Sequence, residues 1–369
     1  MKARSIAKQL KWISAFIPGL ICPGKIIAQS AFKGVQNLFT EPKHYFVNYV
    51  SRPPLIDGNI ADSVWQKAAW TSDFEDIEGD IKPKPPLQTR VKMLWGDSCI
   101  YIAAEITDPH VWATLTHHDD IIFRDNDFEV FIDPNNTTHQ YFEIEYNALN
   151  TVFDLFLNKP YRNGGSAMIA WDANDLKSAV KVKGTLNNPS DVDKSWTIEM
   201  AIPYKAISIG NTVQIPKEGS MWRINFSRVE WDTQIVDGKY IKLKDSAGNN
   251  LPEHNWVWSP QGVVNMHYPE RWGYLIFKKQ AEDNAAFKLP ESEEQKKYLW
   301  LIYYREKQWF EKHKVYTSSL KELGLAEIIN VNGKTYLLKL EASSHQFMAF
   351  VNSNSNKMPV SINQEGLVK

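Results

Sequence analysis

The most informative part of the chain for chemistry is the segment from 121 to 133, Ile-Ile-Phe-Arg-Asp-Asn-Asp-Phe-Glu-Val-Phe-Ile-Asp. Asp127 and Glu129 alternate here with apolar residues that begin at Phe128, and a two-residue period is typical of a strand with one buried face. A carboxylate beside an aromatic ring suits a sugar, because a pyranose presents hydroxyl groups at its edge and C–H groups on its faces. The segment therefore indicates a sugar-binding surface, with an ordinary solvated strand face as the alternative.

A second pair of carboxylates, Glu143 and Glu145, has the same spacing on what we expect to be an adjacent strand. Carboxylates gathered on one sheet face repel one another unless they are paired, hydrated or bound to a cation. The nearest candidates for pairing are Arg223, Asn225 and Arg228.

Two further explanations of these carboxylates remain open. One is a calcium site. The other is a glycosidase pair drawn from Glu129, Glu143 and Glu145, in which one carboxylic acid protonates the leaving oxygen and a second acts as base or nucleophile. The histidines form no metal motif, since the adjacent His117 and His118 would point to opposite faces of an extended segment.

Composition places the chain among ordinary globular proteins. With 369 residues, of which 43% are hydrophobic and 23% charged, it can bury one large core and a second small one. The formal net charge of -1 gives no electrostatic case for binding nucleic acid or an anionic membrane surface. The 14 tryptophans and 19 prolines favour a β-rich fold with many turns, and tryptophan also supplies the flat platforms on which sugars stack.

Residues 1–30 read as a secretory signal peptide. They combine a basic start, an apolar run from Trp12 to Cys22 that is too short to span a bilayer, and small residues at Ala28-Gln29-Ser30. We therefore expect a secreted, periplasmic or cell-surface protein with no membrane span. Its mature form would keep Cys99 alone and so have no intrachain disulfide.

After a linker at 31–44, residues 45–279 have the alternating apolar segments, separated by turn residues, that are typical of a mainly β domain. Alternating apolar patterns predict strands at 89–95, 100–106, 127–132, 140–147, 151–157, 179–184, 195–202, 221–229 and 273–278. No sustained helical period intervenes, so two packed antiparallel sheets, an antiparallel β-sandwich, are the expected arrangement.

Residues 280–369 change in character and predict a C-terminal extension made of helices and a hairpin. A helix is expected from Glu291 to Lys314, and a second short helix between Ser319 and Gly324. Asn332-Gly333 predicts a β-hairpin turn. The long helix has an apolar band too wide to face water, so we expect it to dock on the sandwich or on a protein partner.

The order of several motifs resembles the pattern of carbohydrate-binding module family 9 over about residues 45–278. The motifs are Asp57-Gly58-Asn59-Ile60, Val64-Trp65, Leu94-Trp95-Gly96-Asp97, the segment from Asp127 to Asp133, the segment from Trp196 to Pro203, Trp258-Ser259-Pro260, Pro269 and Trp272-Gly273. The resemblance implies a DOMON-like, immunoglobulin-like two-sheet sandwich that binds a mono-, oligo- or polysaccharide, often with calcium as a structural ion.

The resemblance also assigns candidate ligand-binding residues. The glutamate of the family motif falls on Glu129, and the first of two sandwiching tryptophans falls on Phe123. The polar contacts on the following strand fall on Glu143 and Glu145, where characterised members carry a basic residue and an amide. The second tryptophan falls near Met266.

The aromatic sandwich is therefore incomplete in this sequence, and other tryptophans are candidates to complete it: Trp112, Trp171, Trp231 and Trp256. A buried indole in the core is the commoner use of each. Asp127, Arg223 and Asn225 complete the expected ligand-binding set.

These observations predict an exported, non-catalytic protein that captures sugars or polysaccharide chain ends in glycan degradation. Two alternatives stay open. The first is a hydrolase of O-glycosyl bonds. The second is a haem-binding, electron-transfer protein with Met266 or the adjacent His267 as an iron ligand, which needs a second ligand from elsewhere in the chain.

Overall fold

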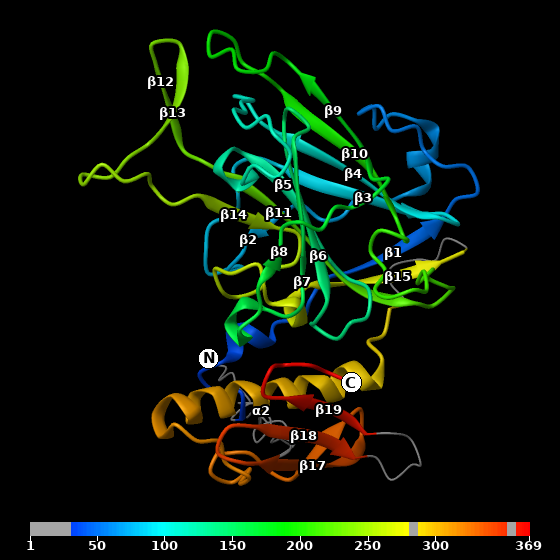
Figure 1. Ribbon diagram of the computed structural model, residues 1–369, viewed down its shortest axis with the longest axis vertical. Helices are drawn as coiled ribbons and strands as arrows, with labels where there is room; N and C mark the ends of the chain where they lie inside the picture. The colour runs from blue at the N-terminus through cyan, green and yellow to red at the C-terminus, as the bar shows by residue number, and fades with distance from the viewer. Residues whose placement is uncertain (1–30, 280–286, 353–358) are drawn as a thin grey trace, which may run out of the picture.

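The computed structural model describes residues 31–279, 287–352 and 359–369. The expected signal peptide, at residues 1–30, lies outside the described residues. The described part forms a large β-sandwich, a long helix beneath it and a small C-terminal sheet under the helix (Figure 1).

Thirteen strands form the sandwich as one continuous hydrogen-bonded sheet. They are β1 (His44–Tyr49), β2 (Glu75–Asp76), β3 (Thr89–Trp95), β4 (Cys99–Thr107), β5 (Asp127–Asp133), β6 (Tyr141–Asn147), β7 (Val152–Leu157), β8 (Ala167–Met168), β9 (Lys177–Lys183), β10 (Ser195–Pro203), β11 (Met221–Glu230), β14 (His254–Val257) and β15 (Gly273–Lys278). The main path runs β8-β7-β6-β5-β11-β15-β1-β3-β4-β10-β9, and β14 pairs with β11 and β2.

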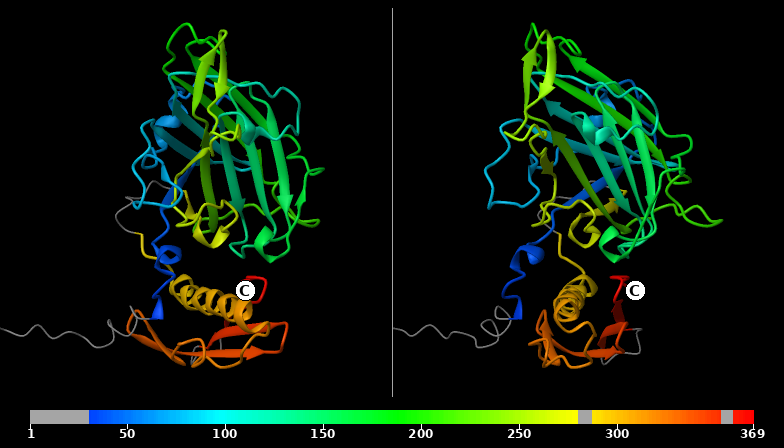
Figure 2. Two further views of the ribbon diagram at one scale, coloured as in Figure 1. Left: turned by 90° about the vertical axis from the view of Figure 1, so that its left-hand side faces the viewer. Right: turned by 60° about the vertical axis from the view of Figure 1, so that its left-hand side comes forward.

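The sheet curls so that its two halves face each other across one core (Figure 2). Phe128 and Val130 of β5 point inward from one half, and Ile102 of β4 and Ile198 of β10 point inward from the other. All four side chains are buried in the same apolar cluster. The predicted β-sandwich is therefore confirmed.

Strand β1 is the corner between the halves. His44–Asn48 pair with β15 and Asn48 and Tyr49 pair with β3, and both pairings are parallel. All other pairings in this sheet are antiparallel, so the expectation of purely antiparallel sheets is wrong only at β1. A strand that passes from one half to the other without a hairpin has no local turn that the sequence could signal.

All nine strands expected from the alternating patterns are present. The sequence pattern missed the shorter strands β1, β2, β8 and β14, and a protruding arm formed by β12 (Thr233–Val236) and β13 (Lys239–Lys242). Short helical turns join the strands: η1 (Gln36–Phe39), η2 (Ser63–Lys67), η3 (Ile122–Arg124), η4 (Tyr161–Asn163) and η5 (Pro269–Arg271).

The outer face of β5 is buried as well as the inner one. Asp127, Glu129, Phe131 and Asp133 are all at most 5% exposed. The loops before β5 and after β14 cover part of this face, and Ile122 and Met266 from these loops form a smaller apolar cluster with Phe131. The solvated strand face considered from the sequence is therefore not what the structure shows.

The C-terminal extension contains α2 (Glu291–His313) and a four-stranded antiparallel sheet made of β16 (Ile328–Val331), β17 (Lys334–Ala342), β18 (Phe347–Asn352) and β19 (Val360–Asn363). The predicted helix is confirmed to within one residue. The predicted hairpin at Asn332-Gly333 is also confirmed, with both residues at positive φ as that turn requires, but it forms only half of the sheet.

The prediction of a second short helix between Ser319 and Gly324 is wrong. Ser319 Oγ accepts a hydrogen bond from the backbone N–H of Glu322, as a helix cap would, but the chain forms a turn that stops at Gly324. One turn is too short for helical hydrogen bonding to propagate.

Helix α2 lies between the sandwich and the C-terminal sheet (Figure 1). Its apolar side chains, including Leu299 and Ile302, pack on that sheet together with Val35 from the segment expected to be a linker. On its other side, the Tyr304 hydroxyl donates to Glu270 of the sandwich at 2.5 Å. The expected docking of the helix on the sandwich is thus present, but most of its apolar band faces its own sheet.

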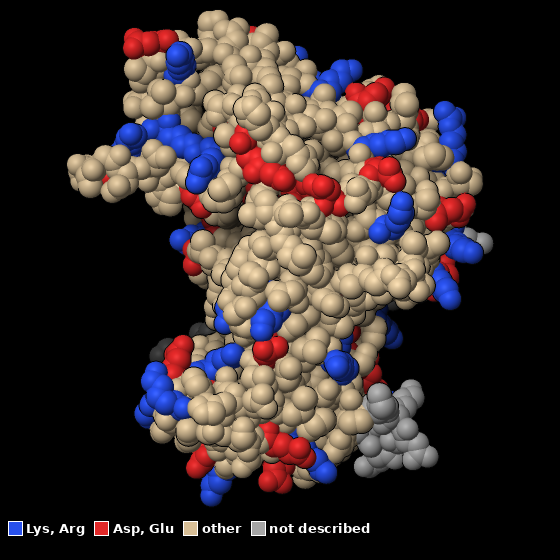
Figure 3. Space-filling model, in the orientation of Figure 1, with Lys and Arg blue, Asp and Glu red and all other residues tan. Residues whose placement is uncertain are grey.

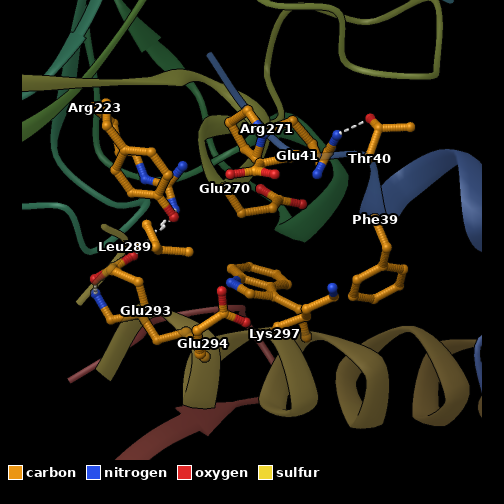
Figure 4. Close-up of a pocket in the computed structure, with 14 residues that line it drawn as sticks. Phe39, Thr40, Glu41, Arg223, Glu270, Arg271, Leu289, Glu293, Glu294 and Lys297 are labelled. Carbon is orange, nitrogen blue, oxygen red and sulfur yellow. Dashed lines mark hydrogen bonds and ion pairs between the residues drawn. The ribbon is translucent and has the colours of Figure 1, made fainter. Parts of the chain in front are cut away.

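A cavity of about 110 Å³ remains between α2 and the sandwich (Figure 4). Charged side chains point into it from both sides, among them Arg223 and Arg271 from the sandwich and Glu293 from α2. They are satisfied by one another and by nearby groups: Arg223 pairs with Glu293 at 3.2 Å, and Arg271 donates to the Thr40 hydroxyl at 2.5 Å. The ion pair between Arg223 and Glu293 holds the extension on the sandwich.

None of the helices that the structure describes is long and apolar enough to cross a membrane.

Candidate functional site

A larger cavity, of about 460 Å³, opens on the outer face of β5, β6 and β7. Its floor comes from the strands, and its walls come from the loop before β5, the loop after β7 and the loop after β14. Five of the ten predicted ligand-binding residues line it: Phe123, Glu129, Glu143, Glu145 and Met266.

Strand register explains how the acidic residues meet. In the antiparallel pairing of β5 with β6, Glu129 lies directly opposite Glu145, and Glu143 lies opposite Phe131. Because side chains alternate between the two faces of a strand, Asp127 and Glu129 share the outer face with both glutamates of β6. The same-face spacing read from the sequence is therefore confirmed, and Asp127 lies beneath the cavity as a sixth member of the site.

The carboxylates lie very close together. One oxygen from each of Asp127, Glu129 and Glu145 lies within 4.8 Å of the other two. Asp127 Oδ1 accepts a hydrogen bond from the backbone N–H of Val229 at 3.0 Å. Asp127 Oδ2 and Glu129 Oε2 are buried and have no hydrogen-bond partner.

This crowding changes the acidity of the whole group. Burial, with the negative charge of Glu253 nearby, raises the pKa of Glu129 to about 7. Burial and then the neighbouring carboxylates hold the pKa values of Asp127, Glu143 and Glu145 well above their usual range. The surroundings therefore stabilise the ionised forms of these carboxyl groups poorly.

The basic partners expected from the sequence are engaged elsewhere. Arg223 pairs with Glu293 of α2, and Arg228 pairs with Glu230 at 2.8 Å. The expectation that either arginine neutralises the cluster is therefore wrong. The partner of Arg223 lies 70 residues further along the chain, where spacing does not reveal it, whereas Glu230 lies two positions after Arg228 on the same face of β11.

Asn225 does not line the cavity, although it lies directly opposite Phe131, which does. Its side chain exchanges two hydrogen bonds of 2.9 Å with the backbone of Ser259, one in each direction. It is fully buried, so its observed role is to hold the loop after β14 on the sheet. No lysine or arginine lines the cavity in the ranges that the structure describes.

Two exposed aromatic rings belong to the cavity wall. Phe123 is 39% exposed and Tyr161 is 44% exposed, so both rings are available to a ligand in the cavity. Phe123 is fixed on both sides of its backbone: its N–H donates to Glu145 Oε2 at 3.0 Å, and its carbonyl accepts from Trp231 Nε1 at 2.9 Å. The Tyr161 ring packs edge-on against His267 at 4.5 Å between centroids.

Tyr161 is the residue that sequence analysis missed. It lies on η4, in the loop after β7, where Pro160 before it and Gly164 after it are the local signals of a turn. None of the four tryptophans proposed as the second platform lines the cavity. Trp112 and Trp256 are buried, Trp171 packs against Phe142 in the core, and Trp231 supports the backbone of Phe123.

Met266 and His267 lie together in the cavity wall. Met266 is buried, and its carbonyl accepts from Trp272 Nε1 at 2.8 Å. His267 Nδ1 contacts the Tyr141 hydroxyl at 3.0 Å, and burial lowers the pKa of His267 to about 4. The imidazole is therefore neutral near pH 7 and does not offset the carboxylates.

A second acidic group lies nearer the surface. Ligand atoms of His118, Asp119, Asp154 and Asp172 lie within 4.8 Å of one another, with Asp154 buried and the other three more exposed. His118 Nε2 lies 3.2 Å from Asp154 Oδ1. The sequence shows no metal motif among the histidines, but folding brings His118 together with Asp172, which lies 54 positions further along the chain.

The fold and the cavity define a β-sandwich binding module with an acidic floor and an aromatic rim. Residues 56–279 match the model of the carbohydrate family 9 binding domain-like family, and the chain belongs to that family. No curated protein matches the chain.

Solved structures of low sequence identity are similar to this chain. A carbohydrate-binding module of family 9 from Caldicellulosiruptor kristjanssonii, in complex with cellotriose, is 18% identical, with a TM-score of 0.41, 67% of this chain covered and 100% of that one. A family 9 module from the same organism, in complex with glucose, is 17% identical, with a TM-score of 0.42, 65% of this chain covered and 98% of that one. A proposed carbohydrate-binding protein from Bacteroides uniformis ATCC 8492 is 16% identical, with a TM-score of 0.46, 64% of this chain covered and 100% of that one.

Proposed function

We propose that the protein binds carbohydrate in the cavity over β5, β6 and β7. The observation that carries this proposal is the convergence of two exposed rings, Phe123 and Tyr161, on a floor of carboxylate acceptors. Rings contact the C–H faces of a pyranose, and carboxylate oxygens accept hydrogen bonds from its hydroxyl groups. The volume of about 460 Å³ is within the usual range for a small-molecule site.

Membership in the family supports a sugar as the ligand, and it leaves the kind of sugar open. The finer part of the proposal is that the protein is exported and captures sugars or chain ends during glycan degradation. On the face shown in Figure 3, basic side chains are mixed with acidic ones, and a row of acidic side chains crosses the sandwich, which disfavours an anionic partner.

A glycan array on the chain from residue 31 onward tests the binding proposal, with glucose and cellotriose among the probes. Titration calorimetry on the array-positive glycans then compares Phe123→Ala and Tyr161→Ala with the wild type. Ile235→Ala is the matched control, because Ile235 is an exposed apolar residue on β12, outside the cavity. Binding that is unchanged in both aromatic variants would exclude this cavity as the site.

Hydrolysis of O-glycosyl bonds by carboxyl groups drawn from Glu129, Glu143 and Glu145 stays a prediction. An assay for released reducing ends decides the matter. Haem binding and a DOMON relationship likewise stay predictions.

Export is tested by the intact mass of the protein recovered outside the cytoplasm. A start near Ala31 supports signal-peptide removal, and retention of residues 1–30 in the exported form contradicts it.

A further inference from the structure

We infer that Asp127, Glu129 and Glu145 hold one calcium ion at the floor of the cavity, and that this ion also binds hydroxyl groups of the sugar. The second part of this inference rests on the proposed function. The ion would neutralise the repulsion among the three carboxylates and would coordinate the hydroxyl groups of the bound sugar.

The spacing of the oxygens fits calcium. Calcium binds oxygen ligands at about 2.3 to 2.6 Å, so two ligands on opposite sides of the ion are roughly 4.6 to 5.2 Å apart. The three carboxylates offer oxygens within 4.8 Å of one another, which is a spacing found between oxygens that share one calcium ion.

The unsatisfied oxygens point to a ligand. Asp127 is fully buried and Glu129 is 5% exposed, yet Asp127 Oδ2 and Glu129 Oε2 accept no hydrogen bond. A buried carboxylate oxygen without a partner loses its hydration and gains nothing in return. A cation between them supplies the missing interaction for both oxygens at once.

A shared proton is the competing way to relieve the repulsion, and the raised pKa values allow it. A proton shared between two carboxyl groups is a hydrogen bond, with the oxygens roughly 2.5 to 3.0 Å apart. Such a proton joins only one pair of carboxyl groups, as between Glu143 and Glu145, whereas Asp127, Glu129 and Glu145 each offer an oxygen to one common centre. A single ion at that centre satisfies the open oxygens of Asp127 and Glu129 together, and a proton between Glu143 and Glu145 leaves both without a partner.

The position of the cluster connects the ion to the sugar. Glu129 and Glu145 line the cavity, whereas Asp127 lies beneath it, so the ion would have protein on one side and open space on the other. Calcium takes six to eight oxygen ligands. Three carboxylates leave positions free toward the cavity, and adjacent sugar hydroxyl groups are neutral oxygen ligands of suitable spacing.

Thermal unfolding with and without calcium chloride tests the metal site on the chain from residue 31 onward. Calcium should raise the midpoint of the wild type, and Glu145→Gln should abolish that rise. The variant should fold, because a glutamine oxygen can still accept the Phe123 N–H, and loss of a crowded charge should raise the midpoint in the absence of calcium.

Asp172→Asn is the matched control at the second acidic group, where His118, Asp119 and Asp154 lie. It should keep the calcium-induced rise. No rise in the wild type overturns the inference. A rise that survives in Glu145→Gln and disappears in Asp172→Asn assigns calcium to the second group and also overturns it.

Titration calorimetry with an array-positive glycan, in calcium chloride and in EDTA, tests the shared role. Affinity at least tenfold lower in EDTA supports it. Equal affinity overturns the sugar role of the ion while the proposed function survives. Absence of glycan binding by the calcium-loaded wild type refutes the proposed function itself.

Discussion

The backbone N–H of Phe123 donates a hydrogen bond of 3.0 Å to Glu145 Oε2. This bond joins the aromatic rim of the cavity to its acidic floor, because the residue that presents the exposed ring is held by one of the crowded carboxylates. A change in the charge of Glu145 therefore acts on the position of the ring as well as on the floor.

The first prediction concerns the rim. Phe123→Ala and Tyr161→Ala should each weaken glycan binding about tenfold, since loss of an aromatic contact removes on the order of 1 to 2 kcal/mol. The free energy of unfolding should change little, because both rings are partly exposed. Calorimetry beside urea unfolding separates the two effects, and weakened binding that follows loss of stability would contradict the prediction.

The second prediction concerns Glu129 as an acceptor. Glu129→Gln keeps the shape of the side chain and removes its charge, so binding should weaken by roughly 1.5 to 3 kcal/mol, which is about tenfold or more. Glu218→Gln makes the same change at a half-exposed glutamate outside the cavity, so it is the matched control. Equal losses in the two variants would show a structural effect and not the loss of an acceptor.

The third prediction concerns pH. The pKa of Glu129 is raised from 4.5 to about 7, so its protonated form is favoured in the folded state. Its contribution to stability is fully present below pH 4.5 and is lost as the pH rises through 7. Without calcium, Glu129→Gln should therefore gain stability relative to the wild type as the pH rises, by at most about 1.4 kcal/mol per pH unit.

Urea unfolding at pH 5, 6, 7 and 8 in EDTA measures this difference. Asp172→Asn is the control, because Asp172 is an exposed carboxylate in the other acidic group. If the difference in the free energy of unfolding between the wild type and Glu129→Gln is the same at all four pH values, the pKa of Glu129 is not raised in the folded state.

The family resemblance assigned Phe123 to the site, whereas local patterns were sufficient to predict the strand β5 and the outward direction of Glu129. Each depends only on neighbours in the sequence, where a two-residue period specifies which side chains share a face. The opposing position of Glu145 followed from the same period on the next strand.

Contacts between remote segments were not predictable in this way. Tyr161 enters the cavity because the loop after β7 folds back over the sheet, and nothing in the spacing of residues 157–167 specifies that direction. The same holds for Arg223, whose partner Glu293 lies 70 residues further along the chain. The sequence also does not show that the outer face of β5 is covered, since the covering loops have no periodic pattern.

The fourth prediction concerns the core under α2. Ile302 is fully buried between the helix and the C-terminal sheet, so Ile302→Ala should cost roughly 2 to 5 kcal/mol of stability. Gln308→Ala is the control on the exposed part of the same helix, where a substitution changes stability by about 0.5 kcal/mol or less. Equal unfolding midpoints for Ile302→Ala and the wild type would contradict this packing.

The fifth prediction concerns the ion pair that joins α2 to the sandwich. Arg223 and Glu293 are both buried, and Arg223 also donates to the Trp272 carbonyl and the Tyr274 hydroxyl. Removing one member of a buried pair leaves the other charge uncompensated, so Glu293→Ala should cost roughly 3 to 5 kcal/mol. Lys82→Ala, which breaks an exposed pair with Glu78, should cost less than about 1 kcal/mol.

The same pair should make the wild type sensitive to acid. Burial opposes ionisation of Glu293, but Arg223 and Lys296 outweigh it and hold the pKa of Glu293 below its usual 4.5. The pair therefore stabilises the fold above about pH 4.5, and that contribution is lost as the pH falls through the lowered pKa. The stability difference between the wild type and Glu293→Ala should shrink between pH 5 and pH 3. A difference that stays constant over this range would show that Glu293 acts through packing and not through its charge.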